Sequence, residues 1–371
     1  MNKNSKIYIA LWVFVSISLL SIIGCMTVNT DPFFHFHAPD TASYFYTLDN
    51  QRSQNDGIMK HFDYQGLITG TSMTENFRTS EAEDLFGVTF IKVPFEGASF
   101  KEIDNNIRTA LEANDNLKII IRGLDMRMFL EDKDYMREDL GTYPTYLYDD
   151  NIFNDVRYLF NRDVFFTRIY PMIKDKSNKG ITSFDEYSNW MGGYTFGLKT
   201  IYPDGVAYEP FPDQEEITDQ ERMRVLESVR QNITSLADEY PNTTFYYFFT
   251  PYSVAWWKYQ IDTGNFDKQT EAERIVIAEI LNHDNIMLFS FNDEATITTD
   301  LNNYKDDLHY GEWINTLILK YMKEGHDRLT KDNYERYLSR EKELYMTFDY
   351  MELNKQIDYD NDYDAANIAL R

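Results

Sequence analysis

Short apolar runs and amphipathic stretches alternate along the chain after residue 65. Between the runs, apolar side chains recur at the three- and four-residue spacing that marks one face of a helix. Strands that alternate with helices form parallel sheets, because each helix returns the chain to the same end of the sheet. The pattern therefore predicts an α/β fold with a five-stranded parallel sheet, whose strands are Gly66–Thr71, Phe86–Val93, Leu117–Ile121, Thr244–Phe249 and Asn285–Phe289.

Helix starts are indicated by capping motifs. A Thr or Ser followed three positions later by Glu forms a capping box, in which each side chain bonds a free backbone N–H of the first turn. Thr218-x-x-Glu221 and Thr270-x-x-Glu273 each predict such a start, and residues 54–62 read as a further short helix. Apolar stripes predict three more helical faces, over Phe100 to Leu111, Leu226 to Leu236 and Ile314 to Tyr321.

The amino-terminal stretch predicts a membrane anchor. No charged residue occurs from Ile7 to Thr30, and a helix of this length, at about 1.5 Å per residue, can cross a hydrocarbon core of about 30 Å. Lys3 and Lys6 precede the stretch and Asp31 follows it, so we expect the amino end in the cytoplasm. Residues 1–30 then form a cytoplasmic start and a single transmembrane helix, and the domain that follows is extracytoplasmic at the cell membrane.

Cys25 gives a second interpretation of the same stretch. It is the single cysteine, so no intrachain disulfide can form. Ile22-Ile23-Gly24-Cys25 is similar to a bacterial lipobox, where cleavage before the cysteine and lipidation would leave a lipoprotein. Both interpretations anchor the same domain outside the membrane. The apolar run is long for a signal peptide, which favours the uncleaved helix.

The remaining chain divides by composition. Residues 31–325 hold the predicted α/β domain, and residues 326–371 read as a helix followed by an acidic tail that includes Asp358–Asp364. From 126 to 212 the alternation stops, and the sequence is rich in Tyr, Phe, Asp and Arg. Loops that follow a middle strand overhang the functional edge of such folds. The aromatic-rich insertion is therefore expected to form a lid, a substrate groove or a folded appendage.

Charge excludes some partners. With 36 basic and 61 acidic residues, the formal charge is −25, which argues against a nucleic acid or an anionic lipid surface as partner. Aromatic residues make up 16% of the chain, more than a core needs, so exposed tyrosines and a carbohydrate-facing surface are both expected. His35 and His37 would share one face of an extended strand, but two ligands make a weak metal pair, and packing at the membrane interface is favoured.

Ser72 is the first candidate for chemistry. It follows the first predicted strand and precedes helix-forming residues, so it lies on a strand-to-helix turn at the carboxyl edge of the sheet. The first N–H groups of a helix favour a developing oxyanion there. Ser72-x-x-Glu75 also reads as a capping box, in which the serine only satisfies a backbone donor.

Asp306 and His309 are the second candidate pair. An aspartate three residues before a histidine can hold one ring nitrogen while the other takes a proton from a serine. Asp307 could take the place of Asp306 as the orienting carboxylate. The three residues could instead hold a metal, or form a solvated acidic loop that caps the next helix.

A serine after the first strand and Asp-x-x-His after the fifth resemble the SGNH (GDSL-type) hydrolase superfamily. Ser72 aligns with its nucleophile, and Asp306 and His309 with its last block. Together with the anchor, these motifs look like the membrane-anchored members that accompany membrane-bound O-acyltransferases, such as the teichoic-acid D-alanylation protein and alginate O-acetylation proteins. The resemblance implies a flavodoxin-like three-layer fold and a cofactor-free esterase or O-acyltransferase acting on cell-envelope glycopolymers. Implied partners are a cell-surface glycan, an acyl donor and a membrane-bound O-acyltransferase.

The sequence departs from that family at the oxyanion hole. Gly-Thr-Ser-Met replaces Gly-Asp-Ser, and no Gly-x-Asn-Asp block follows a middle strand. Gly123 takes the family's glycine position by its place after the third strand, and Asn76 and Ser253 are nearby candidates. Loss of one donor typically costs about 3 kcal/mol of transition-state stabilisation. A catalytically silent accessory protein, which binds glycan or an acyltransferase partner, is therefore the alternative function.

Overall fold

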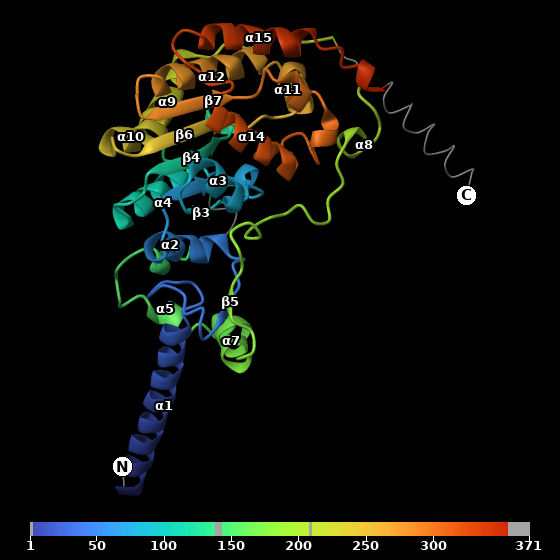
Figure 1. Cartoon of the computed structure of the whole chain (residues 1–371). Helices are drawn as coiled ribbons and strands as arrows, with labels where there is room; N and C mark the ends of the chain where they lie inside the picture. The colour runs from blue at the N-terminus through green and yellow to red at the C-terminus, as the bar shows by residue number, and fades with distance from the viewer. Residues whose placement is uncertain (1–2, 138–142, 208–209, 355–371) are drawn as a thin grey trace, which may run out of the picture. The chain divides into compact units, whose positions relative to one another are not determined.

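The computed structural model describes residues 3–137, 143–207 and 210–354. Figure 1 shows the helices and strands along the chain, which contacts divide into two compact units. Unit 1 comprises Met1–Asp63 and Glu138–Tyr187, and unit 2 comprises Tyr64–Arg137 and Ser188–Arg371. The residues expected to form an insertion are thus shared, with 138–187 in unit 1 and the rest in unit 2.

Unit 2 contains the five-stranded parallel sheet that the apolar runs predict. Its order is β3-β2-β4-β6-β7, which in chain order is the 2-1-3-4-5 arrangement of doubly wound, flavodoxin-like sheets. The first and third strands therefore lie side by side, so the loops after them leave the carboxyl edge next to each other. The strands are β2 (Gly66–Thr69), β3 (Phe90–Lys92), β4 (Ile119–Leu124), β6 (Thr244–Phe249) and β7 (Ile286–Ser290).

Helices cover the sheet on two faces, as right-handed crossovers require. The helix between β2 and β3 crosses toward one edge of the sheet, and the helices that connect the strands after β3 cross toward the other edge, so these two sets lie on opposite faces. Contacts agree, because α3 packs on α14, whereas α4 and α12 both contact the short helix η5. The bounds are α3 (Thr79–Phe86), α4 (Phe100–Ala113), α9 (Asp219–Val229), η5 (Arg230–Thr234), α10 (Ser235–Glu239), α11 (Val254–Asp262), α12 (Phe266–Ile280), α14 (Glu312–Glu324) and α15 (Tyr334–Thr347).

Short elements complete unit 2. They are η1 (Ser72–Thr74), η2 (Met126–Met128), α8 (Leu198–Ile201), α13 (Ala295–Thr298) and η6 (Leu301–Asn303). The predicted helix after residue 328 is present as α15, whereas the acidic stretch 358–364 lies outside the described residues.

Two sequence expectations for unit 2 are wrong at their boundaries. The strand expected from Phe86 begins only at Phe90, because Phe86 ends helix α3 and Gly87 (φ 73°) caps it in the left-handed conformation. The start expected at Thr270 falls inside α12, where the Thr270 hydroxyl donates to the carbonyl of Asp267. The Thr218 capping box, by contrast, is formed at the start of α9.

Unit 1 begins with α1 (Lys3–Thr30). It is the one helix of the described residues that is long and apolar enough to cross a membrane, by length and composition. Later in unit 1, β1 (Phe45–Tyr46) and β5 (Gly180–Ile181) pair in parallel, and the sequence pattern did not predict this pairing. The other elements are α2 (Gln51–His61), η3 (Thr145–Leu147), α5 (Val156–Leu159), α6 (Arg162–Val164), η4 (Phe165–Ile169) and α7 (Tyr170–Lys174).

A buried cluster joins the two stretches of unit 1. Phe33 from the amino-terminal stretch packs with apolar side chains of residues 147–169, chiefly Tyr158, whose ring stacks on Phe33 at 5.4 Å. The expected extended strand at His35 and His37 is a turn instead, because Asp31 (φ 37°) accepts hydrogen bonds from their backbone N–H groups. The two histidine rings bind different partners, so they do not form a metal pair.

Candidate active site

Ser72 opens the short helix η1, three residues after β2 ends. Its Oγ atom lies 2.8 Å from Nε2 of His309. The capping function at this turn belongs to Thr71, whose side chain accepts from the N–H of Met73 at 3.3 Å. The serine hydroxyl is therefore directed at an imidazole rather than at the backbone donor that a capping box would satisfy.

His309 is held by Asp306 on its other side. Nδ1 of the ring lies 2.8 Å and 3.0 Å from the two carboxylate oxygens of Asp306. An ionised carboxylate only accepts hydrogen bonds, so Nδ1 carries the proton and Nε2 is free to accept from the hydroxyl of Ser72. The three side chains form one continuous hydrogen-bonded chain.

The charge of Asp306 is stabilised locally. Burial raises the pKa of its carboxyl, but hydrogen bonds from the ring and backbone N–H of His309 and from the N–H of Leu308 outweigh burial. The net effect holds the pKa of Asp306 below its ordinary range, so this group stays ionised at neutral pH. At Asp307, burial and the neighbouring charge of Asp306 raise the pKa instead. Asp306 is therefore the better orienting carboxylate of the two.

Ser253 supports the loop that carries these residues. Its N–H and its hydroxyl both donate to the backbone carbonyl of Asp307, at 3.1 Å and 2.8 Å. The same hydroxyl accepts from the N–H of Ala255 and caps α11. The hydrogen-bonding capacity of Ser253 is thus used in the protein, and we assign it a structural function rather than a place in an oxyanion hole.

The turn that carries Ser72 is tied to the next strand of the sheet. The hydroxyl of Thr71 donates to one carboxylate oxygen of Asp125, which follows β4, at 2.8 Å. Tyr252 donates to the other oxygen at 2.7 Å. Asp125 is buried, so its two partners compensate for the loss of water around the charge.

Buried donors hold the backbone beyond Ser72. The ammonium group of Lys92 on β3 donates to the carbonyl oxygens of Glu75 and Phe77. The phenol of Tyr310, next to His309, donates to the carbonyl of Met73 at 3.2 Å. These contacts fix the position of the serine turn relative to the histidine loop, as a preorganised site requires.

Gly123 has a packing function. It lies inside β4, opposite Phe248 of β6, and a Cβ atom placed on it would meet the Cγ2 atom of Thr74 at 3.0 Å. Only glycine therefore lets η1 pack this closely on the sheet. The contacts place Gly123 beneath the serine turn, and we see no ligand-facing group that it contributes.

Asn76 offers a donor. Its Oδ1 accepts from the backbone N–H of Trp190 at 3.1 Å, and this contact determines which end of the amide is oxygen. Its Nδ2 is buried and has no hydrogen-bond partner among the described residues. An unsatisfied buried donor is costly, typically about 1–3 kcal/mol, so this amide nitrogen, four positions after Ser72, is a candidate donor of the site.

Trp190 covers this corner of the site and was not singled out from the sequence. Its indole Nε1 donates to the carbonyl of Ser72 at 3.3 Å, and its ring meets that of His309 edge to face at 5.7 Å. The ammonium group of Lys305 lies 3.8 Å and 3.9 Å from the ring centres of Trp190 and Tyr194. Such cation–π contacts fix the indole over the site. The aromatic richness of residues 126–212 was the available signal, but it could not select this residue.

A groove of about 630 Å³ opens beside Asp306. Asp306 and Asp307 form one side of it, and Tyr202 and the exposed Tyr259 contribute aromatic rings. Volumes of this size suit small-molecule ligands. The further lining residues are Thr200, Ile201, Gly205, Val206, Ala207, Ala255, Lys258 and Asp262.

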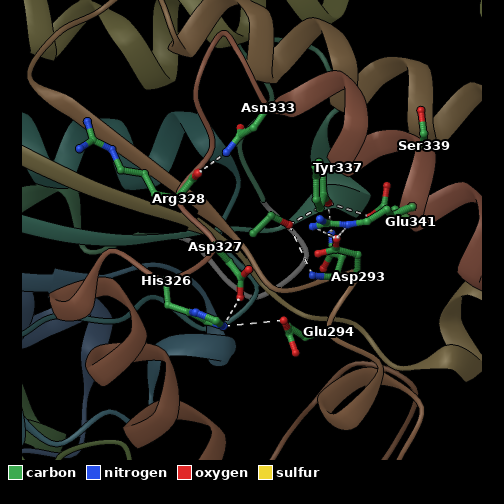
Figure 2. Close-up of polar contacts among 12 residues, drawn as sticks. Asp293, Glu294, His326, Asp327, Arg328, Asn333, Tyr337, Ser339 and Glu341 are labelled. Atoms are coloured by element: carbon green, nitrogen blue, oxygen red, sulfur yellow. Dashed lines mark hydrogen bonds and ion pairs between the residues drawn. The ribbon is translucent and has the colours of Figure 1, made fainter.

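A separate ionisable cluster lies near the carboxyl end of β7 (Figure 2). Nε2 of His326 is 3.1 Å from Asp327 and 3.8 Å from Glu294, and the potential metal-ligand atoms of the three residues lie within 4.8 Å of one another. Burial and the charge of Glu294 raise the pKa of Asp327 to about 6. The contacts of the His326 ring with the two carboxylates account for this arrangement, and we assign it no metal.

Two buried glutamates lie close to this cluster, on α12 and α15. Figure 2 shows Glu341 beside Tyr337, whose phenol oxygen is 2.9 Å from Glu341 and 2.6 Å from Glu273. Burial raises the pKa of both carboxyls, that of Glu273 to about 7. This network is remote in sequence from Ser72 and contributes to stability rather than to the site.

Comparisons with known proteins find likeness in structure only. No protein-family model matches the chain, and no curated protein matches it significantly. A protein from Streptococcus pneumonia, provisionally described as a platelet activating factor, aligns with a TM-score of 0.40 at 11% identity, over 74% of this chain and 91% of its own. The acetyl xylan esterase Est2A from the rumen bacterium Butyrivibrio proteoclasticus aligns with a TM-score of 0.28 at 10% identity, over 74% and 64%. At these scores the likeness adds nothing to the argument from the site.

Proposed function

We propose that this chain is a membrane-anchored, extracytoplasmic esterase or O-acyltransferase of the SGNH type that modifies cell-envelope glycopolymers. Ser72 is the nucleophile, His309 the general base and Asp306 the orienting carboxylate. The observation that carries the proposal is the continuous hydrogen-bonded chain from Ser72 through His309 to Asp306. The loop after β2 and the loop after η6 are far apart in the sequence of unit 2. Folding alone does not require them to align a hydroxyl, an imidazole and a carboxylate in this order.

The proposed reaction has two steps. Oγ of Ser72 attacks the acyl carbon of an ester while Nε2 of His309 takes its proton, and the imidazolium then protonates the departing alcohol. This leaves an acyl-serine. In the second step His309 takes a proton from water or a sugar hydroxyl as that oxygen attacks the acyl carbon. The bond from the acyl carbon to Oγ then breaks, and the imidazolium of His309 returns the proton to Oγ of Ser72. Asp306 keeps the tautomer correct and stabilises the imidazolium throughout.

Asn76 is the proposed side-chain donor to the oxyanion. The unpartnered Nδ2 atom supports this assignment, because the bond from Trp190 to Oδ1 leaves the amide nitrogen available. The N–H of Ser72 is the first of η1, so the helix itself cannot bond it, and it would be the second donor. Gly123, the other residue expected at the oxyanion hole, allows close packing inside β4, so only its backbone could contribute to the hole.

A saccharide acceptor is supported by the aromatic rings around the site. Trp190 and Tyr194 lie next to the histidine loop, and Tyr259 is 60% exposed at the groove beside Asp306. Flat apolar rings with polar edges suit the faces of sugar rings. A cell-surface glycan would thus be the acceptor, and a membrane-bound O-acyltransferase is the proposed source of acyl groups.

Labelling by a fluorophosphonate tests the proposal. The full-length chain in detergent micelles should react, and Ser72→Ala should abolish the reaction, while His309→Ala should slow it by at least 100-fold. Ser339→Ala, which removes an exposed serine hydroxyl on α15, is the matched control and should label like the wild type. Absence of labelling in a folded wild-type chain would refute catalysis and favour the silent accessory protein. Labelling that persists in Ser72→Ala would place the nucleophile elsewhere.

A second measurement tests Asn76. With an acetyl ester as substrate, Asn76→Ala should lower kcat by about 100-fold and leave KM within a few-fold, because an oxyanion donor acts in the transition state. Asn76→Asp keeps the acceptor for the N–H of Trp190 but removes the donor, so it should be as slow as the alanine variant. Full activity in Asn76→Asp would exclude Asn76 from the oxyanion hole.

A further inference from the structure

Residues 152–179 of unit 1 carry a surface unlike the rest of this acidic chain. Within these residues there are six basic and three acidic side chains, a net charge of +3, whereas the whole chain carries −25. Arg168 pairs with Asp49. The other five basic residues are all exposed, namely Arg157, Arg162, Lys174, Lys176 and Lys179.

Large apolar side chains are exposed among these charges. Phe153 is 83% exposed and Ile152 is 73% exposed. Neighbouring large apolar side chains are rarely this exposed on a surface that faces only water. Phe166 is 60% exposed on η4. The remaining members are Val156, Phe160 and Tyr170. We call residues 152–179, with these apolar and basic side chains, the interfacial segment.

The interfacial segment packs on the last turns of α1. Both α5 and η4 contact α1, and the hydroxyl of Thr27 donates to the carbonyl of Leu159 at 3.0 Å. A Cβ atom on Gly24 would lie 3.8 Å from the ring of Phe160, an ordinary contact distance, so this ring lies against the helix at Gly24. Figure 1 shows α5 at the carboxyl end of α1.

Depth along α1 places Phe160 at the edge of a bilayer. From Ile7 to Val28 an apolar helix extends roughly 33 Å, at about 1.5 Å per residue, against a hydrocarbon core of about 30 Å. Gly24 is four residues from the end of this run, so a ring beside it lies within about 6 Å of the boundary. An apolar groove of about 520 Å³ lies between α1 and Phe160, lined by Leu20, Cys25 and Val28 among others, and this apolar lining suits a lipid chain.

From these observations we propose that the interfacial segment lies in the outer boundary of the membrane, with its apolar rings among the lipid chains and its basic residues on anionic headgroups. The inference rests on α1 spanning the membrane, which belongs to the proposed function. The net charge of the whole chain argues against an anionic lipid surface as partner. Charges separated by more than about 10 Å are largely screened, so the local charge of +3 determines the interaction of this segment. Aromatic residues and exposed lysines are typical of membrane interfaces.

Depth-dependent quenching in vesicles tests the proposal with the full-length chain. Trp12 of α1 reports on the anchor, since brominated lipid chains quench a tryptophan within the core. Trp190, Trp256, Trp257 and Trp313 of unit 2 fluoresce in every variant, so each reporter is measured as the difference from the Trp12→Phe parent. In that background Phe153→Trp reports on the interfacial segment, and Phe211→Trp, an exposed phenylalanine of unit 2, is the matched control. We expect the residue 153 reporter to be quenched at least twofold more by lipids brominated near the headgroup than by lipids brominated near the chain end, and the residue 211 reporter to be unquenched.

Lipid charge supplies the second arm. In phosphatidylglycerol vesicles the quenching of the residue 153 reporter should exceed that in phosphatidylcholine at least twofold, and Lys174→Glu, Lys176→Glu and Lys179→Glu combined should remove the difference. Quenching of Trp12 without quenching at residue 153 would refute the interfacial segment and leave the anchor intact. Equal quenching at residues 153 and 211 would show no specific surface. Absence of quenching at Trp12 itself would refute the anchor.

Discussion

Replacing Glu273 by glutamine is expected to change how the stability of unit 2 depends on pH. Glu273 and Glu341 are fully buried, and the phenol of Tyr337 lies within 3 Å of both, at 2.6 Å and 2.9 Å. One phenol carries one hydrogen, so it can donate to only one carboxyl. The two carboxyls are also hydrogen-bonded to each other, which requires a proton on one of them, because two ionised carboxylates only accept. The fold therefore selects a protonated carboxyl.

The magnitude follows from the pKa. Burial raises the pKa of Glu273 from its ordinary 4.5 to about 7. A carboxyl with a raised pKa in the fold stabilises it fully below the unfolded pKa, and this stabilisation is lost as the pH rises to the folded pKa. At about 1.4 kcal/mol for each pKa unit, the loss between pH 4.5 and about 7 is on the order of 3 kcal/mol. Glu273→Gln cannot ionise, so it should escape this loss.

Urea unfolding at pH 5, 6, 7 and 8 measures the effect. Trp257 stacks on Tyr345 of α15 at 4.5 Å, so tryptophan fluorescence reports on this region of unit 2. The free energy of unfolding of Glu273→Gln minus that of the wild type should rise by roughly 3 kcal/mol across this range. Glu343→Gln, on the exposed side of α15, should leave the pH dependence unchanged. A difference that stays constant with pH would refute the shared proton.

Three further predictions concern the site and its support. Asp306→Asn should lower esterase kcat on the order of 10³- to 10⁴-fold by allowing the wrong tautomer, whereas Asp307→Asn should stay within a few-fold; equal losses would mean that the carboxylates act together. Trp190→Phe removes the donor to the carbonyl of Ser72, worth about 1 kcal/mol, so kcat should fall about fivefold, and an unchanged kcat would show that the ring alone suffices. Lys92→Met leaves buried carbonyls without a donor and should lower the urea-unfolding free energy by roughly 3 kcal/mol, a loss that Lys92→Arg should partly restore.

The central sheet was predictable because buried parallel strands are short, nearly continuous apolar runs. The predicted boundaries were wrong where one local sequence feature fits two kinds of element. Phe86 is as apolar as the strand that follows, and only the left-handed Gly87 shows that a helix ends there. Thr270-x-x-Glu273 has the spacing of a cap, but α12 begins at Phe266, because packing of an apolar face outweighs a capping preference.

Motif order singled out Ser72, Asp306 and His309, and these side chains lie in hydrogen-bond contact, although their functions stay a prediction. The contacts of Trp190 with Ser72 and His309 could not be predicted, because Trp190 lies in a segment whose apolar residues show no periodicity. The pairing of β1 with β5 was not predicted either, because each strand has only two residues and the two strands are far apart in the chain. Spacing along the sequence reports on local structure, and these contacts are nonlocal.

The parallel pairing of β1 with β5 has a consequence for how the chain can be synthesised and shortened. Phe45 pairs with Gly180 only after the ribosome has made the first three strands of the larger sheet. Unit 1 therefore cannot finish folding until its second stretch has been synthesised. A fragment that starts at Tyr64 would leave Tyr158 without Phe33 and β5 without its neighbour. Soluble versions should therefore begin near Asp31, because a later start would remove the packing partners of residues 138–187 and leave them as an unfolded loop.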